Sequence, residues 1–162
     1  MKITVFDAKP YDIEFFEKWN EKYGAKITYF EEKLSLKNVM LTKYQDVVCT
    51  FVNDDLNEKV ISILSKNGVR AIAIRAAGYN NVDMRAAYHN RVTVFRVPAY
   101  SPYAVAEHAL ALLMTVNRKI HKAYNRTRDS NFSLVGLTGI DLNGKTAGII
   151  GTGKIARIFI KI

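Results

Sequence analysis

Short apolar runs alternate with helical patterns through the first hundred residues of the chain. Five runs rich in β-branched residues predict strands, and they cover residues 3–6, 27–30, 47–51, 71–74 and 92–95. Between the first two runs, apolar side chains recur at spacings of three and four and predict one stripe of an amphipathic helix: Ile13, Phe16, Trp19 and Tyr23. Strand runs separated by helices favour a parallel sheet with both faces covered.

Residues that cap or stop helices support this alternation. Asp12 is expected to cap the first helix and Gly24 to end it. Asn57 is expected to cap a second helix that stops at Gly68. In a parallel sheet ligands bind beyond the carboxyl ends of the strands, so the loops after Ile74 and Val97 are the first places to search for a site.

The pattern changes after Pro98. Residues 104–118 predict a long apolar helix that we expect to pack inside a protein, because Glu107 and His108 interrupt it and it is too short to span a membrane. A basic helical stretch follows, and residues 146–150 then predict a strand. The chain ends in a predicted turn and helix.

Composition places the chain among ordinary globular proteins. Of its 162 residues, 49% are hydrophobic and 24% charged, which excludes disorder, collagen and coiled-coil rods. The single cysteine, Cys49, excludes a disulfide framework and is expected to be a buried structural thiol in a reducing cytoplasm. No apolar run is long enough for a membrane span and the first residues do not resemble a signal peptide, so we expect no membrane partner.

The net charge of +9 is unevenly distributed. Lys and Arg exceed Asp and Glu by two before residue 117 and by seven from there onward. Nucleic-acid binding through residues 117–128 is the weaker interpretation, because few aromatic residues interleave with these charges and a basic run is usually a solvated face. We expect no nucleic-acid partner.

The most specific local motif is Gly151–Ala156, a G-x-G-x-x-A pattern between a predicted strand and a predicted helix. The first glycine permits the turn, and the second lets a pyrophosphate approach the backbone at the helix N-terminus. The alternative is a simple glycine turn, and the acidic residue expected about 20 positions farther on would lie beyond Ile162.

Two further loops could carry chemistry. In the segment 75–83, small residues allow backbone N–H groups to converge on an anion such as a small carboxylate. Alternatively, Asn80 or Asn81 serves only as a turn residue and Asp83 as a helix cap. In the segment 97–108, Ser101 is expected to be an N-cap with proline at the first helical position.

These segments, in this order, resemble the D-lactate dehydrogenase group of the D-isomer-specific 2-hydroxyacid dehydrogenases. The matching runs are Lys2–Asp7, Arg75–Asp83 (RAAGYNNVD), Val97–His108 (VPAYSPYAVAEH) and Gly151–Ala156 (GTGKIA). The resemblance covers the whole chain. Tyr103 stands where a small polar residue is expected, and Ala156 replaces the usual third glycine.

The resemblance implies an α/β fold in two parts. Residues 1–99 would form a flavodoxin-like parallel-sheet substrate domain, and residues 100–162 the truncated beginning of a Rossmann NAD-binding domain. The family reduces pyruvate to D-lactate with NADH. The residues that would hold the substrate are Ala77, Gly78 and Tyr100. Those that would hold the cofactor are Val105, Gly151, Gly153, Lys154 and Ile155. The helix 104–118 and the basic stretch after it resemble elements of a homodimer contact.

The family's catalytic Arg, Glu and His would lie downstream of Ile162, so we assign no catalytic residue and no metal ligand. His89 and His121 are expected on solvated surfaces, and His108 to be a satisfied structural histidine. The last helix should present its apolar side chains to nothing and form a patch prone to association: Ile155, Ile158, Phe159 and Ile162.

We expect the chain to be an N-terminal fragment without dehydrogenase turnover of its own. The alternative is a non-catalytic truncated product, or a fragment that associates with another chain through its apolar helix. The identity of the 2-keto acid and the choice between NAD and NADP stay open.

Overall fold

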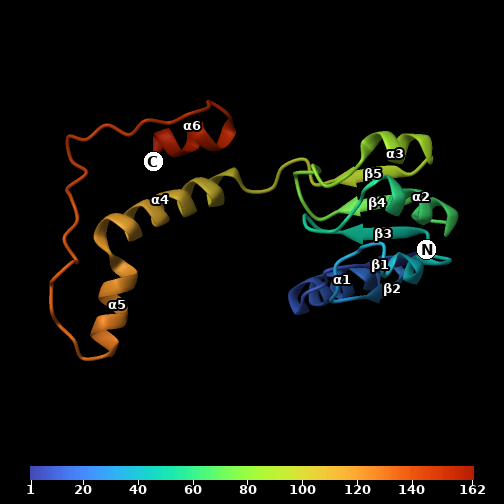
Figure 1. Ribbon diagram of the computed structural model, residues 1–162, viewed down its shortest axis with the longest axis horizontal. Helices are drawn as coiled ribbons and strands as arrows, with labels where there is room; N and C mark the ends of the chain where they lie inside the picture. Colours follow the sequence, from blue (N-terminus) through green and yellow to red (C-terminus); the bar gives the residue numbers. More distant parts are fainter. The chain divides into compact units, whose positions relative to one another are not determined.

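The computed structural model describes residues 1–162, which form two compact units, Met1–Pro98 and Ala99–Ile162 (Figure 1). The first unit contains a sheet of five parallel strands. They are β1 (Lys2–Val5), β2 (Lys26–Tyr29), β3 (Val47–Thr50), β4 (Ala71–Ile74) and β5 (Thr93–Arg96). All five strands were predicted, and no bound differs from its prediction by more than one residue.

The strand order is β2-β1-β3-β4-β5, with β1 and β3 as neighbours near the centre. Ile3 pairs with Val47 in this register, and Val5 pairs with Cys49. From β1 the chain first adds β2 on one side and then adds β3, β4 and β5 on the other side. The direction of strand addition therefore reverses between β1 and β3. Ligands in open parallel sheets bind beyond the carboxyl ends of the strands near such a reversal.

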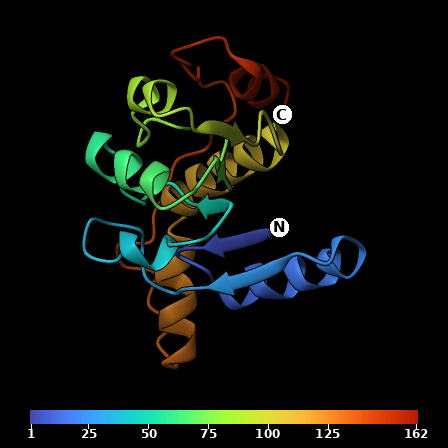
Figure 2. The same cartoon turned by 90° about the vertical axis from the view of Figure 1, so that its right-hand side faces the viewer.

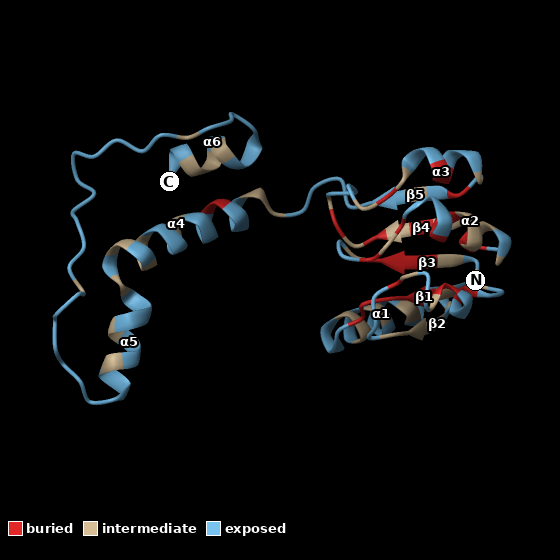
Figure 3. Ribbon diagram, viewed as in Figure 1, coloured by how far each residue is buried: buried red, intermediate tan, exposed pale blue.

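Helices cover the two faces of this sheet (Figure 2). They are α1 (Pro10–Tyr23), the 3₁₀-helix η1 (Val39–Thr42), α2 (Glu58–Lys66) and α3 (Met84–His89). Alternate strand residues face opposite ways. Phe6, Val48 and Ile72 belong to the larger core, which includes the apolar residues of α2, and Val5 and Cys49 pack with α1. Buried residues are concentrated in the strands and on the side of α2 that faces them (Figure 3).

The predicted caps of the later helices are confirmed. The Asn57 side chain accepts a hydrogen bond from the Val60 N–H at 3.0 Å, and Asp83 accepts one from the Ala86 N–H at 2.9 Å. Gly24 ends α1 in the left-handed region, with φ of 61°. Asp83 is therefore a helix cap, which confirms the alternative interpretation of this residue given above.

Two predictions for α1 are wrong. The helix begins at Pro10, so Asp12 lies inside the first turn and accepts a hydrogen bond from the Lys9 N–H at 3.0 Å. Pro10 explains the earlier start, because its fixed φ suits the first helical position. Trp19 and Tyr23 are exposed, with 64% and 68% of their surface accessible, because the helix turns only Ile13 and Phe16 of the predicted stripe into the core.

The second unit contains three helices, α4 (Pro102–Arg118), α5 (Ile120–Arg128) and α6 (Lys154–Lys161). Ser101 caps α4 as predicted, because its hydroxyl accepts a hydrogen bond from the Ala104 N–H at 3.2 Å. Lys119 separates α4 from α5 in the left-handed conformation. No helix is both long and apolar enough to cross a bilayer.

The end of the chain differs from expectation in two ways. The predicted strand at residues 146–150 does not form, because the second unit offers no other strand to share its backbone hydrogen bonds. The last helix was expected to have no packing partner, but α6 packs on α4, and Ile158 and Phe159 are half-buried. Ile155 and Ile162 remain exposed.

The long helix α4 is also more exposed than its apolar sequence predicts. Only Ala106 is buried, while Leu112, Leu113 and Val116 each expose more than 40% of their surface. His108, expected to be a satisfied structural histidine, lies on the exposed side of this helix. The helix packs on α6 along part of its length and also contacts α5, so it cannot bury a full apolar circumference.

Candidate functional site

The loop that follows β4 presents backbone N–H groups at the carboxyl end of the sheet. Ala77 is half-buried and Gly78 is exposed. Neither N–H donates a hydrogen bond to another group of the chain. The carbonyls of this segment are occupied, because Val97 N–H donates to the Ala76 oxygen at 3.1 Å and Arg96 Nη1 donates to the Ala77 oxygen at 3.0 Å.

The backbone conformation at position 78 does not require a glycine. Gly78 does not lie in the left-handed region, and an added Cβ would meet no atom within 4 Å. The absent side chain leaves the approach to the N–H open. A carboxylate can thus come close to this backbone, which is what an anion site made of amides requires.

The loops after β3 and β4 are joined by Asn81. Its side-chain amide donates to the Phe51 oxygen at 3.1 Å and to the Asp54 oxygen at 3.0 Å. Asn81 is therefore a link between loops and not only a turn residue, whereas Asn80 is exposed. Asp54, only 2% exposed, links the loop after β3 to the segment after β2, because its carboxylate accepts hydrogen bonds from the N–H groups of Phe51 and Leu34.

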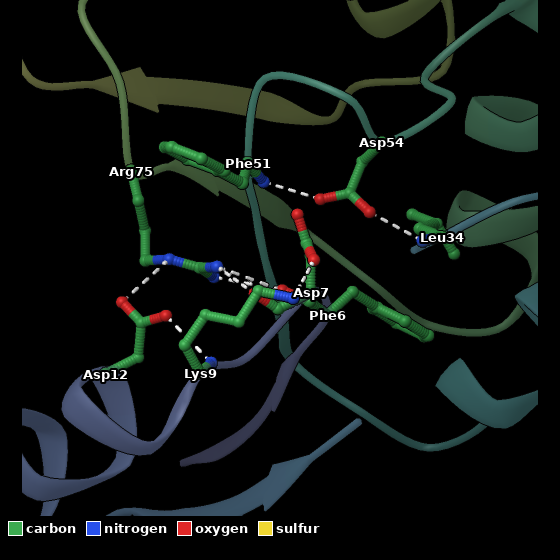
Figure 4. Close-up of polar contacts among 8 residues, drawn as sticks. All are labelled: Phe6, Asp7, Lys9, Asp12, Leu34, Phe51, Asp54 and Arg75. Carbon is green, nitrogen blue, oxygen red and sulfur yellow. Dashed lines mark hydrogen bonds and ion pairs between the residues drawn. The ribbon is translucent and has the colours of Figure 1, made fainter. Parts of the chain in front are cut away.

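Arg75, directly after β4, ties together the carboxyl ends of three strands (Figure 4). Its guanidinium donates to the Phe6 oxygen at 3.1 Å and to the Asp7 oxygen at 2.9 Å. It also lies over the Phe51 ring, 5.5 Å from the centroid. Nε of Arg75 is 3.5 Å from the carboxylate of Asp12 on α1. This network fixes the point from which the Ala77–Gly78 loop starts.

A small pocket of about 200 Å³ adjoins this network between the ends of β1 and β3, and its lining includes Asp7, Lys9, Asp12 and Arg75. Its charges are already paired, since Lys9 Nζ lies 2.8 Å from Asp7 and Arg75 lies beside Asp12. The donors of Arg75 are used by carbonyl oxygens. The pocket therefore offers an incoming anion no free cation, unlike the N–H groups of the neighbouring loop.

Burial changes the titration of two side chains near Arg75. Burial raises the pKa of the Asp54 carboxyl above its ordinary value, although hydrogen bonds from Phe51 and Leu34 act in the opposite direction. Burial also raises the pKa of the Cys49 thiol, and the nearby Arg75 guanidinium only partly offsets it. Cys49 is 4% exposed and is thus a protonated, inert thiol at neutral pH, as predicted.

The glycine turn before α6 has two glycines with different requirements. Gly151 adopts φ of 97°, which L side chains rarely adopt. Gly153 is the N-cap of α6 with φ of −69°, and an added Cβ there would meet no atom within 4 Å. The first glycine is needed by the backbone itself, and the second leaves space for a group that approaches from outside.

The N-terminus of α6 has the properties of an anion site. No side chain caps it, and the first intrahelical hydrogen bond is the one from Arg157 N–H to the Gly153 oxygen. The N–H groups of residues 154–156 are therefore free, and the helix dipole adds positive potential at this end. A pocket of about 610 Å³ lies here, and four of the predicted cofactor residues line it: Gly151, Gly153, Lys154 and Ile155.

The other predicted residues lie elsewhere. Val105 is on α4, 40% exposed and outside the lining of this pocket. Tyr100 belongs to the second unit and is 74% exposed. His89 and His121 are exposed. No group of three or more His, Cys, Asp or Glu side chains is arranged as metal ligands.

Arg75, Arg96 and Asp54 were not singled out from the sequence. Arg75 and Arg96 lie at or directly beyond the ends of β4 and β5, which is a recognisable signal in a parallel sheet. Asp54 has no such signal in the sequence. One of its backbone partners, Leu34, is 20 residues away, and the contact with the other, Phe51, depends on the conformation of the loop after β3.

Comparison with known proteins agrees with this geometry. The family profile described as "D-isomer specific 2-hydroxyacid dehydrogenase, catalytic domain" matches residues 3–151. The 2-hydroxyacid dehydrogenase homolog 1 of Schizosaccharomyces pombe is 52% identical over 161 residues, covering 99% of this chain and 48% of that protein. The D-lactate dehydrogenase of Escherichia coli is 49% identical over 162 residues, covering all of this chain and 49% of the relative.

Solved structures give the same result. The apo-structure of the E. coli D-lactate dehydrogenase superposes with a TM-score of 0.91, covering 99% of this chain and 51% of the other. The D-lactate dehydrogenase of Lactobacillus jensenii with NAD⁺ has a TM-score of 0.68 at 31% identity, covering 98% and 49% of the two chains. This chain belongs to the D-isomer-specific 2-hydroxyacid dehydrogenase family, and it spans about half the length of the curated relatives it matches.

Proposed function

We propose that this chain carries the carboxylate-binding loop and the phosphate turn of an NAD-dependent D-2-hydroxyacid dehydrogenase that interconverts pyruvate and D-lactate. In this proposal residues 1–99 are the substrate domain and residues 100–162 the beginning of the NAD-binding domain, and the protein acts in the cytoplasm. The observation that carries the proposal is the pair of free N–H groups at Ala77 and Gly78 at the carboxyl end of the sheet.

The substrate part of the proposal rests on chemistry that suits a small 2-keto acid. Two adjacent amides can donate to the two oxygens of one carboxylate, and charge-assisted hydrogen bonds of this kind are about twice as strong as neutral ones. The Tyr100 hydroxyl would assist. Pyruvate is the substrate that the resemblance to D-lactate dehydrogenases favours.

The cofactor part rests on the turn before α6. The free N–H groups of residues 154–156 and the open space at Gly153 fit a dinucleotide pyrophosphate, with Lys154 and Ile155 beside it. Val105 would line the nicotinamide pocket. NADH, when bound, supplies the hydride that reduces the keto carbonyl.

Hydride reduction of a carbonyl also needs a cation to polarise the oxygen and a group that delivers the proton. The residues of this chain that we assign bind ligands and do neither. We therefore expect the 162-residue polypeptide to bind its ligands without turnover. The exposed apolar residues of α4 (Leu112, Leu113 and Val116) favour a contact with a second copy, as in a homodimer.

Binding by the ¹⁵N-labelled chain tests the proposal. Oxamate, an unreactive analogue of pyruvate, should shift the amide resonances of Ala77 and Gly78. The variant Gly78→Ala should weaken this response without changing the fold, because its Cβ meets no atom of the chain. Asn80→Ala, in the same exposed loop, is the matched control. A response spread over unrelated residues, or equal in Gly78→Ala, would contradict the proposal.

A second pair of variants tests the cofactor part. Lys154 and Lys161 lie at opposite ends of α6, and both are exposed. Lys154→Met should weaken NADH binding and Lys161→Met should not, although both remove one positive charge. Equal loss in the two variants would show a general charge effect, and the assignment of the phosphate turn would then be wrong.

A further inference from the structure

We propose that Arg96 is a positioning residue that orients the Gly78 amide for the substrate carboxylate. This inference rests on the proposed function and extends it to a side chain that does not itself touch the ligand. It follows from the hydrogen bond between Arg96 Nη1 and the Ala77 oxygen, at 3.0 Å.

The planarity of the peptide bond gives this contact its consequence. The Ala77 carbonyl and the Gly78 N–H belong to one trans peptide group, and the chain has no cis peptide bond. In such a group the C=O and the N–H point in opposite directions. Arg96 holds the oxygen from one side and thereby directs the Gly78 N–H to the other.

The preceding peptide group is held in the same way. Val97 N–H donates to the Ala76 oxygen at 3.1 Å, so the Ala77 N–H points away from the end of β5. Two consecutive carbonyls are thus fixed by two consecutive residues of one strand end. Each of the two N–H groups therefore points away from the group that holds its own peptide carbonyl, and neither has a hydrogen-bond partner within the chain.

The guanidinium has further contacts that hold it in place. Its Cζ lies 5.4 Å from the centroid of the Tyr79 ring, and Nη1 is also 3.5 Å from the Pro98 oxygen. A planar group that stacks and donates at the same time is restrained better than a lysine ammonium would be. A cation on the carbonyl also withdraws electron density from the peptide group, which makes the Gly78 N–H a stronger donor.

Arg96→Met tests the inference against Arg70→Met. Arg70 is an exposed arginine directly before β4, at the other end of the same sheet, so its loss removes equal charge far from the loop. Unchanged amide shifts in the strands would verify that both variants fold.

The first measurement needs no ligand. Loss of the bond to the Ala77 carbonyl should shift the ¹⁵N resonance of Gly78 in Arg96→Met and leave it unchanged in Arg70→Met. An unshifted Gly78 resonance in Arg96→Met would overturn the inference whether or not the chain binds oxamate.

The second measurement is an oxamate titration in about 1 M salt, where the Debye length is about 3 Å and attraction at a distance is screened. Arg96→Met should weaken binding about tenfold, as expected when a donor loses a charge-assisted partner. A loss that disappears at this salt concentration would mean that Arg96 only attracts the anion, and would overturn the inference while the proposed function stands. A wild-type chain that does not respond to oxamate would overturn both.

Discussion

Asp12 and Arg75 join the first turn of α1 to the end of β4, with 3.5 Å between a carboxylate oxygen and Nε. Both side chains are largely buried, exposing 15% and 14% of their surface. Arg75 thus connects a helix on one face of the sheet with the backbone of β1 and with the loop proposed to bind a carboxylate. Arg75 therefore links the stability of the first unit to the loop for which we propose ligand binding.

Arg75→Met should lower the free energy of unfolding of the first unit by about 2–4 kcal/mol, because it leaves two buried carbonyls and the Asp12 carboxylate without their partner. Hydrogen exchange of the β1 and β3 amides measures this unit separately from the second. Arg70→Met should change the free energy of unfolding of the first unit by no more than about 0.5 kcal/mol.

The double variant with Asp12→Ala measures the ion pair itself. A coupling energy of about 1 kcal/mol is expected for two groups in direct contact. Additive effects of Asp12→Ala and Arg75→Met would mean that the ion pair contributes nothing and that the carbonyl hydrogen bonds alone hold Arg75.

Gly151→Ala and Gly153→Ala should separate folding from nucleotide binding in the phosphate turn. Alanine at position 151 is strained by about 1–2 kcal/mol, because φ there is 97°. At position 153 it is unstrained and would hinder only an approaching pyrophosphate.

The Cα and Cβ chemical shifts of α6 report the fold, and NADH fluorescence reports binding. We expect altered shifts at the start of α6 in Gly151→Ala, and native shifts with weakened NADH binding in Gly153→Ala. Native affinity in Gly153→Ala would contradict the assigned role of the turn.

Cys49 should react with a thiol reagent only when the first unit opens. Burial raises its pKa from an ordinary value of 9.0, so little thiolate forms in the folded chain at pH 8. Alkylation should be slower than in urea-unfolded chain by at least about a hundredfold, equivalent to an opening free energy of about 2.7 kcal/mol. Equal rates before and after unfolding would show that the thiol is accessible.

Asp54 should contribute more to the free energy of unfolding at acid pH than at neutral pH. Its folded-state pKa lies above the ordinary 3.8, so the fold favours the protonated carboxyl. The contribution is full below the unfolded pKa and is lost as the pH rises through the folded pKa.

The difference in unfolding free energy between the wild type and Asp54→Asn should therefore decrease as the pH rises above 3.8. A ¹³C titration of the carboxyl gives the midpoint directly. A midpoint at or below 3.8 would show that the hydrogen bonds from Phe51 and Leu34 outweigh burial.

The strands and most caps could be predicted because their causes are local. β-Branched runs define the five strands, and Asn57 and Asp83 stand three residues before the N–H groups that they accept from. The start of α1 was placed too late because Asp12 matches the cap pattern while Pro10 decides the first turn. Trp19 was assigned to the apolar stripe of the helix but is exposed, because spacing alone does not show how wide the covered face of a helix is.

The site was only partly predictable for a different reason. The motif around Gly78 contains the backbone that we propose faces the ligand, but the residues that hold this backbone lie on or after other strands. Arg96 is 19 residues from the carbonyl it holds, and Asp54 is 20 residues from Leu34. Such pairs depend on strand order, which no local pattern contains. The strand predicted at residues 146–150 failed because a strand needs a partner strand.

The cradle at Ala77 and Gly78 consists of main-chain amides, which neither gain nor lose a proton in water. Acidifying the solution therefore leaves these donors unchanged. If the proposed site binds a carboxylate, protonation of that carboxylate removes the charge that the amides recognise. Side-chain replacements at these two positions change the bulk around the cradle but cannot remove its donors, unless proline is introduced.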